Sequence, residues 1–238
     1  MADGCLVLDF DGTILDTERS RFQTWVDLWS EHAHELTLAE WQRSFGTDDL
    51  FDPWGELERR VGSPLDPSLR IRRRSRQNEL QAEYGPRPGV MTWLLEARDL
   101  NVPVGIASSA PIEWVEANLE MLGIRSFFST LVCRDDEIPA KPEPISYLLA
   151  CERLGSEPSR SVVVEDSPNG VAAASTAGLF TVAVPHALTE GLDLSSADVV
   201  LPTLPCLEGL TLSDALTRAS SIVSGDSHLD GPFHSEPT

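Results

Sequence analysis

The feature that most constrains this chain is the segment Asp9-Phe10-Asp11-Gly12-Thr13, which directly follows the apolar run of residues 5–8. A short, wholly apolar run bounded by turn residues is typical of a buried central strand in a parallel sheet. Such sheets bind ligands just beyond the carboxyl ends of their strands. Carboxylates this close repel each other unless a cation or a shared proton compensates. The segment therefore predicts a site for a metal ion, a phosphate group or both.

Composition limits the partners of the chain. The 238 residues carry a formal net charge of −20, which argues against nucleic acids and anionic membrane surfaces as partners. No apolar stretch is long enough to span a bilayer, and the N-terminus leads directly into the first predicted strand. The four cysteines, Cys5, Cys133, Cys151 and Cys206, form no C-x-x-C pair. We therefore expect buried free thiols and a cytoplasmic location.

The basic residues are unevenly placed. Residues 59–76 contain seven of the 18 basic residues, all of them arginines. They form either a solvated helix face or a positive rim that steers a phosphate ester toward the site. The single lysine of the chain, Lys141, follows Ala140 and precedes Pro142. A compact ammonium suits a tight anion site differently from a planar guanidinium, although a lone lysine can also stand here by chance.

Apolar runs and helix-like stretches alternate from about residue 87 onward. The runs cover residues 102–107, 127–133, 161–165, 179–184 and 198–201, and helix-like stretches cover residues 90–100, 112–122, 144–154, 168–177 and 206–218. This alternation predicts an α/β fold, a doubly wound, Rossmann-like parallel sheet joined by right-handed crossovers. We assign residues 1–15 and 88–218 to this core domain.

The insert between the first two strands is predicted to be helical. Phe22, Val26 and Trp29 recur at helical spacing, and further helical segments are expected at residues 37–45, 49–61 and 67–84. We assign residues 16–87 to a helical cap that can open and close over the two aspartates. The tail, residues 219–238, is rich in small and polar residues and is expected to be disordered.

Three more predicted strand ends carry polar residues. Ser108 and Ser109 suit a phosphoryl oxygen, but they also precede Pro111 as an ordinary helix N-cap would. Lys141 can reach an anion, and Glu165 with Asp166 forms a second carboxylate pair. Oxygen-only ligands from two strand ends match the preference of Mg²⁺. The set predicts phosphoryl transfer, with the cation and the lysine offsetting charge on the phosphoryl oxygens.

These segments resemble the haloacid dehalogenase-like superfamily, in the branch with a small helical cap that holds β-phosphoglucomutases and sugar-phosphate phosphatases. The resemblance covers residues 5–205, and its most specific parts are the segments of residues 9–18 and 165–170. It implies that Asp9 is the nucleophile, forming an aspartyl-phosphate, and that Asp11 is the general acid and base.

The resemblance also implies a ligand set. Asp9, Asp11 through its backbone carbonyl, and Asp166 would hold Mg²⁺, with Glu165 as a ligand or close behind the ligands. Ser108, Ser109 and Lys141 would bind the phosphoryl group. An acid at position 11 argues against a dehalogenase, which needs no proton for its leaving group.

Phosphatase and mutase differ in three places. β-Phosphoglucomutases carry a histidine where this chain has Arg21, an arginine shortly after the cap glycine where it has Asp48 and Asp49, and a serine-lysine pair where it has Ala110 and Pro111. Acids and proline are poor hosts for a second phosphate. We therefore expect hydrolysis of small monophosphates, sugar or polyol phosphates above all, with a phosphosugar mutase as the alternative and a catalytically silent binding protein as a remote one.

The cap is expected to select the organic portion of the substrate. Six residues could face the site: Arg21, Trp25, Phe45, Gly46, Thr47 and Asp48. Trp25 and Phe45 can equally well be packed in the core of the cap. No oligomerisation face is evident, so a monomer is expected.

Overall fold

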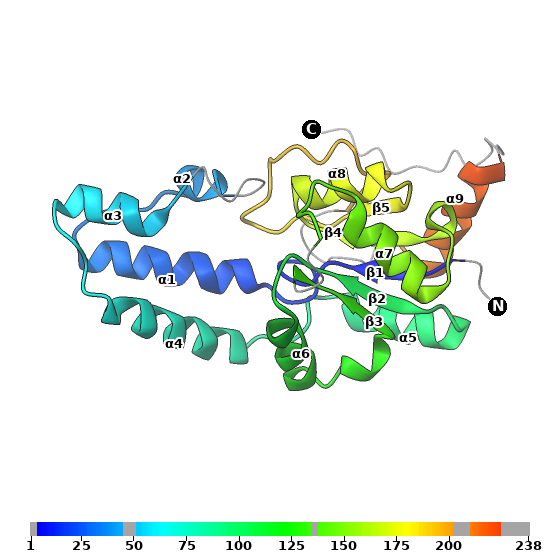
Figure 1. The fold of residues 1–238 in the computed structure, drawn as a ribbon, viewed down its shortest axis with the longest axis horizontal. Coiled ribbons are helices and arrows are strands. Elements are labelled where there is room, and N and C mark those ends of the chain that lie inside the picture. The colour runs from blue at the N-terminus through cyan, green and yellow to red at the C-terminus, as the bar shows by residue number, and fades with distance from the viewer. Residues whose placement is uncertain (1–3, 45–50, 135–137, 202–209, 225–238) are drawn as a thin grey trace.

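A six-stranded parallel sheet forms the centre of the molecule (Figure 1). The structure, a computed structural model, describes residues 4–44, 51–134, 138–201 and 210–224. The strand order is β3-β2-β1-β4-β5-β6. The strands are β1 (Leu6–Leu8), β2 (Val104–Ala107), β3 (Thr130–Val132), β4 (Val162–Glu165), β5 (Phe180–Ala183) and β6 (Val199–Val200). The predicted doubly wound α/β fold is confirmed, with β1 at the point where the strand order reverses.

Alternate residues of each strand face opposite layers of helices. Leu6 and Leu8 pack toward α5 (Val90–Leu100), α6 (Ile112–Met121) and α9 (Leu212–Ser224), whereas Val7 packs toward α7 (Ile145–Leu154) and α8 (Pro168–Thr176). All three residues of β1 are fully buried. This explains why the run is wholly apolar, since both faces of a central parallel strand are covered.

The 95 residues between β1 and β2, residues 9–103, contain a lobe of four helices that extends from one end of the core (Figure 1). These are α1 (Thr17–Glu31), α2 (Leu38–Gln42), α3 (Pro53–Val61) and α4 (Ser68–Ala82). Side-chain caps mark three of the starts: Asp16 accepts from the Arg19 N–H, Thr37 forms a capping box with Glu40, and Asp52 caps α3. We call these four helices the cap.

Aromatic side chains and arginines hold the cap together. Trp25, Trp29, Trp41 and Trp54 are all buried in one apolar cluster of the cap. The seven arginines of residues 59–76 all have partners. Arg60, Arg70 and Arg73 stack on cap tryptophans, Arg74 stacks on Trp114, and Arg59, Arg60, Arg72 and Arg76 pair with glutamates. The arrangement favours a solvated helix face with paired charges over a free positive rim.

The last helix corrects the predicted start of the tail. Helix α9 begins at Leu212 and runs to Ser224, so residues 219–224 belong to a helix and not to a disordered tail. Ala219 is buried in the main core cluster, and this burial explains why the helix continues. Residues 225–238 lie outside the described part of the chain.

Two expectations from composition can be compared with the structure. Cys5, Cys133 and Cys151 are free and buried, as predicted, while Cys206 lies outside the described residues. In the described residues, no helix is both long enough and apolar enough to cross a membrane.

Candidate active site

The turn after β1 places the two aspartates of the first segment. The backbone N–H of Asp9 donates to the carbonyl of Val164 on the neighbouring strand at 3.0 Å. Beyond it the chain closes a tight turn, in which the Gly12 N–H donates to the Leu15 carbonyl at 2.8 Å. Gly12 has a φ of 87°, in the left-handed region that favours glycine. The turn thus keeps Asp9 and Asp11 at the carboxyl end of the central strand.

Lys141 joins two strand ends through its ammonium. Its Nζ lies 2.5 Å from Asp9 Oδ1, 2.6 Å from Glu165 Oε1 and 3.0 Å from the Ala107 carbonyl. Burial alone would lower the pKa of Lys141, but the Asp9 and Glu165 carboxylates reverse this and raise it above its ordinary value. The lysine is therefore a fixed cation at the end of β1, as the sequence predicts.

Glu165 is committed to protein donors. Its Oε1 accepts from Lys141 and from Tyr147 Oη at 2.7 Å, and its Oε2 accepts the N–H groups of Asp166 and Ser167. Its side chain is fully buried. Of the two places expected for Glu165, as a ligand or close behind the ligands, this arrangement favours the second, because two donors occupy Oε1 and three occupy Oε2.

Asp166 lies beside the first turn and is held from two sides. Thr13 Oγ1 donates to its Oδ1 at 2.8 Å, and His186 Nε2 lies 3.1 Å from its Oδ2. His186 Nδ1 accepts the Leu188 N–H, so Nε2 carries the ring proton and donates to Asp166. The 2% exposure of Asp166 shows that this carboxylate is fixed inside the protein.

Asp11 has a different environment from that of Asp9. Its Oδ1 accepts a hydrogen bond from Trp114 Nε1 of α6 at 3.1 Å. Burial raises the pKa of Asp11 from 3.8 to about 6, although hydrogen bonding opposes that rise. A carboxyl group with this pKa can donate and accept a proton near neutrality, as a general acid and base must.

Asp9 has its pKa raised well above the ordinary value. Burial is the main cause, Lys141 opposes it, and the Glu165 and Asp166 carboxylates add to it. Three buried carboxylates thus act on one another here, and the one ammonium, that of Lys141, contacts only Asp9 and Glu165. An additional cation bound here would offset this excess of negative charge.

The two serines after β2 differ in exposure. Ser108 is buried, its N–H donates to the Val132 carbonyl, and its Oγ accepts the Ala110 N–H at 3.1 Å. Ser109 is exposed. The turn that holds Ser108 follows β2, which is hydrogen-bonded to β1, so Ser108 lies at the same edge of the sheet as Asp9.

The cap residues of the predicted site are separated by the structure. Arg21 is half exposed, pairs with Glu18 and stacks on Trp41, within the electrostatic reach of Asp11. Trp25 is packed edge-on against Trp54 with Arg73 over its ring, so of its two expected places, at the substrate or in the cap core, the structure shows the cap core. Phe45, Gly46, Thr47 and Asp48 lie outside the described residues.

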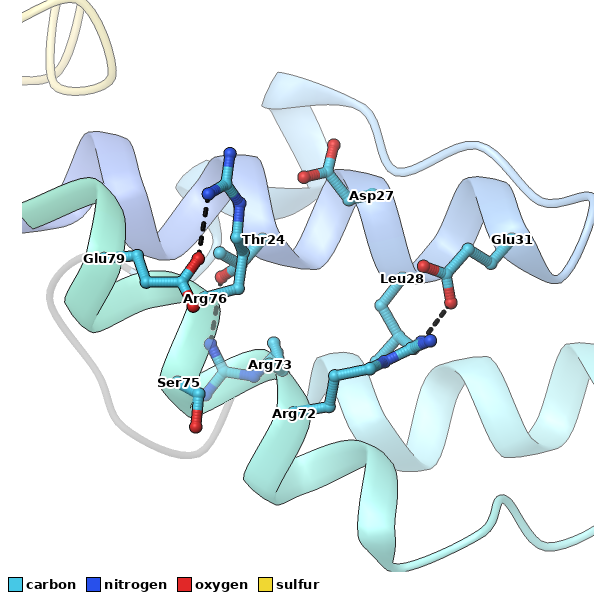
Figure 2. Close-up of a pocket in the computed structure, with 9 residues that line it drawn as sticks. All are labelled: Thr24, Asp27, Leu28, Glu31, Arg72, Arg73, Ser75, Arg76 and Glu79. Atoms are coloured by element: carbon cyan, nitrogen blue, oxygen red, sulfur yellow. Dashed lines mark hydrogen bonds and ion pairs between the residues drawn. The ribbon is translucent and has the colours of Figure 1, made fainter.

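A hollow of about 400 Å³ between α1 and α4 is distinct from this site (Figure 2). Arg72 pairs with Glu31 and Arg76 with Glu79 along its walls, while Arg73 reaches Thr24. None of the predicted site residues lines it. The hollow is therefore a polar groove of the cap surface.

Gly12→Ala is expected to destabilise the protein by more than the unfavourable positive φ of residue 12 alone would. An added Cβ would lie 2.4 Å from Asp166 Oδ2. We expect the free energy of unfolding in urea to fall by about 2–3 kcal/mol, together with phosphate release. Gly62→Ala is the matched control, because its φ of 78° is similar but nothing lies within 4 Å of the added atom. Equal losses of stability and activity in both variants would contradict the close approach to Asp166.

Comparisons with known proteins agree with this geometry. The family model for haloacid dehalogenase-like hydrolases matches residues 4–178. YhcW of Bacillus subtilis, whose name assigns it provisionally to the phosphatases, is 35% identical over 89% of this chain and 96% of its own. Validoxylamine A 7'-phosphate phosphatase of Streptomyces hygroscopicus subsp. limoneus is 29% identical over 83% and 92%.

A crystal structure with the same fold comes from Thermotoga maritima, a protein provisionally assigned as a β-phosphoglucomutase. It has a TM-score of 0.71 and 23% identity, covering 92% of this chain and 99% of that one. The chain therefore belongs to the haloacid dehalogenase-like hydrolases.

Proposed function

We propose that this protein is a Mg²⁺-dependent phosphatase of small phosphorylated metabolites, sugar or polyol monophosphates above all. The observation that carries the proposal is the contact of Lys141 with Asp9 at the end of β1, with Asp11 two residues further on. The relatives named for phosphatase activity support the reaction class, and one of them is named for the phosphate ester validoxylamine A 7'-phosphate.

The donor set fits a magnesium ion. Asp9 and Asp166 offer carboxylate oxygens, and the backbone carbonyl of Asp11 is a third candidate. Among the described residues, no three Asp, Glu, His or Cys side chains stand together as a full ligand set. Mg²⁺ commonly takes only one or two carboxylates and completes its shell with water and substrate phosphate. When bound, the ion would neutralise charge on the buried carboxylates and on the phosphoryl oxygens.

The first half of the proposed reaction transfers the phosphoryl group to Asp9. A carboxylate oxygen of Asp9 attacks phosphorus while the bond from phosphorus to the ester oxygen breaks. Asp11 donates its proton to the departing alcohol, and Lys141 with Ser108 and Ser109 holds the phosphoryl oxygens. The result is an aspartyl-phosphate and a free alcohol.

The second half returns the enzyme to its starting state. The Asp11 carboxylate takes a proton from water, the water oxygen attacks phosphorus, and the bond to Asp9 breaks. Inorganic phosphate leaves, Asp9 is again a carboxylate and Asp11 is again protonated. Asp11 therefore has to change protonation state in each half, which a pKa of about 6 allows.

Release of inorganic phosphate across a panel of phosphorylated metabolites, with and without Mg²⁺, tests this function. We expect metal-dependent release with a preference among sugar and polyol monophosphates. Isomerisation of a phosphosugar without net release would identify a mutase. Absence of both reactions, even with an aryl phosphate, would contradict the proposal.

The pH dependence should reveal Asp11. Because only its protonated form can donate to an alkyl leaving group, kcat/KM for an alkyl phosphate is expected to fall as the pH rises past about 6. An aryl phosphate with a weakly basic leaving group needs no such proton and serves as the control. The same alkaline decline for both substrates would contradict the assignment.

A further inference from the structure

We propose that Trp114 is a positioning residue for Asp11, and that Arg74 of the cap acts on Asp11 through the Trp114 ring. The inference deepens the proposed function, on which it rests. It assigns a role to the contact between Arg74 of the cap and Trp114 of the core, neither of which is a catalytic residue.

The first observation is the hydrogen bond between Trp114 and Asp11. The indole Nε1–H lies 3.1 Å from Asp11 Oδ1, and an indole N–H can only donate. Trp114 is partly buried and packs against the main core cluster, as Ala110 and Ile112 also do. It is therefore a rigid donor on the core, 103 positions away from Asp11 in the sequence.

The donor is itself fixed by its helix. Trp114 lies in the first turn of α6, where its N–H donates to the Pro111 carbonyl at 3.1 Å. Its own carbonyl accepts from Asn118 Nδ2 at 2.7 Å. A carboxyl group that accepts from such a donor loses rotational freedom about its χ angles, and its other oxygen is directed away from the indole. The indole thus restricts the directions in which the Asp11 carboxyl group can present a proton to substrate.

The second observation comes from the cap. The Arg74 guanidinium of α4 lies over the Trp114 ring, with its central carbon 4.8 Å from the ring centroid. A cation over an indole face is attracted by the ring and restrains its orientation. Arg74 belongs to the cap and is exposed, whereas the Trp114 ring belongs to the core. The contact therefore exists only when the cap lies where the structure places it. Arg74, Trp114 and Asp11 thus form a chain from the cap to the proposed acid.

The series of contacts from Arg74 through Trp114 to Asp11 predicts an effect on proton donation that a purely structural role would not have. If Trp114 aims Asp11, its loss impairs proton donation to the leaving alcohol and leaves substrates with weakly basic leaving groups almost unaffected. Trp114→Phe removes the N–H but keeps an aromatic ring beneath Arg74. Arg74→Leu removes the cation but keeps the hydrogen bond.

The experiment compares kcat/KM for an alkyl phosphate and for p-nitrophenyl phosphate in four variants and the parent protein. General acid catalysis contributes about 10²–10⁴ in rate, so a misaimed acid is expected to cost about tenfold on the alkyl ester and less than about twofold on the aryl ester. Arg74→Leu should show the same selectivity at about threefold, in keeping with one cation–π contact. Arg76→Leu, on the same helix but paired with Glu79, is the matched control and should change neither value.

Asp11→Asn separates failure of the inference from failure of the proposed function. It should show the same leaving-group selectivity in larger degree. If Asp11→Asn shows none, the acid role of Asp11 falls and the inference with it. Suppose instead that Asp11→Asn is selective. If Trp114→Phe then lowers kcat/KM equally for both substrates, or leaves both values unchanged, the inference alone is overturned. Thermal unfolding of Trp114→Phe within a few degrees of the parent would show that the comparison concerns a folded protein.

Discussion

Asp9→Asn is expected to abolish phosphate release, with a loss of at least about 10³-fold in kcat. An amide is a poor nucleophile toward phosphorus, so no aspartyl-phosphate can form at this position. Asparagine has nearly the same volume as aspartate, and it removes a buried charge from a group of three carboxylates. We therefore expect the variant to stay folded while its activity is lost. The measurement is steady-state release of phosphate from an aryl phosphate, which needs little help from the general acid.

Asp27→Asn provides the matched control for this substitution. Asp27 is exposed on α1 of the cap and accepts a hydrogen bond from Gln23, so the same chemical change there should leave the rate unaltered. Residual activity of Asp9→Asn within about tenfold of the parent would show that another group attacks the phosphate. That result would remove the nucleophile from the proposed reaction.

Lys141→Met is expected to cost both stability and activity. The substitution leaves Asp9 and Glu165 buried without the ammonium that lies 2.5 and 2.6 Å from them. Breaking a buried ion pair from one side typically costs about 3–5 kcal/mol. We expect a loss of that order in the free energy of unfolding near neutral pH, and loss of phosphate release by about 100-fold or more.

The pH dependence of this loss has a definite sign. Without Lys141, which opposes the rise, the already raised pKa of Asp9 rises further in the folded protein, so the native state binds more protons than the unfolded state. Stability of Lys141→Met should therefore fall as the pH increases through the acidic range. In the parent, the raised pKa of Lys141 means that its contribution is fully present below its ordinary value of 10.5. Destabilisation that does not vary with pH would contradict this electrostatic account.

Arg98→Met separates this effect from the general loss of a basic residue. Arg98 is 63% exposed and pairs only at the surface with Asp99. Exposed ion pairs contribute about 0–1 kcal/mol, so this variant should unfold nearly as the parent does. Lys141→Arg tests whether the shape of the cation matters as well as its charge. The planar guanidinium keeps the charge but does not fit a position where three oxygens lie close to one ammonium.

Strand and helix positions could be predicted from the sequence because the two periodicities are strong. The wholly apolar run before Asp9 is buried on both faces, and the predicted helix of residues 90–100 matches α5. The end of the chain was harder to predict. Residues 219–224 are polar enough for tail sequence, and only the burial of Ala219 in the main core cluster shows why α9 continues through them.

The site could be predicted in part, for a physical reason. Parallel strands bring their carboxyl ends to one edge of the sheet, so Asp9, Ser108 and Glu165 converge once the strand order is known. The strand order does not predict which groups Glu165 binds. Its partners Lys141 and Tyr147 come from the segment before α7 and from α7 itself, and only tertiary packing shows that they occupy both oxygens together with the following turn.

Two residues at the site carry no local signal at all. His186 follows β5 in a loop, and Trp114 is one of several aromatic residues at helical spacing. Each contacts a predicted acid from a different element: His186 reaches Asp166, and Trp114 reaches Asp11. Trp25 shows the opposite case, because its aromatic side chain suits a substrate contact but the cap needs it for its own core.

The most direct test of the central claim is detection of the aspartyl-phosphate itself. The Asp11→Asn variant should form the intermediate from an aryl phosphate but hydrolyse it slowly, since the group that activates water is gone. Acid quenching followed by mass spectrometry of the peptides should then place a phosphoryl group on Asp9 and on no other residue. Phosphate release without any phosphorylated Asp9 peptide, or a phosphoryl group on another side chain, would contradict the account.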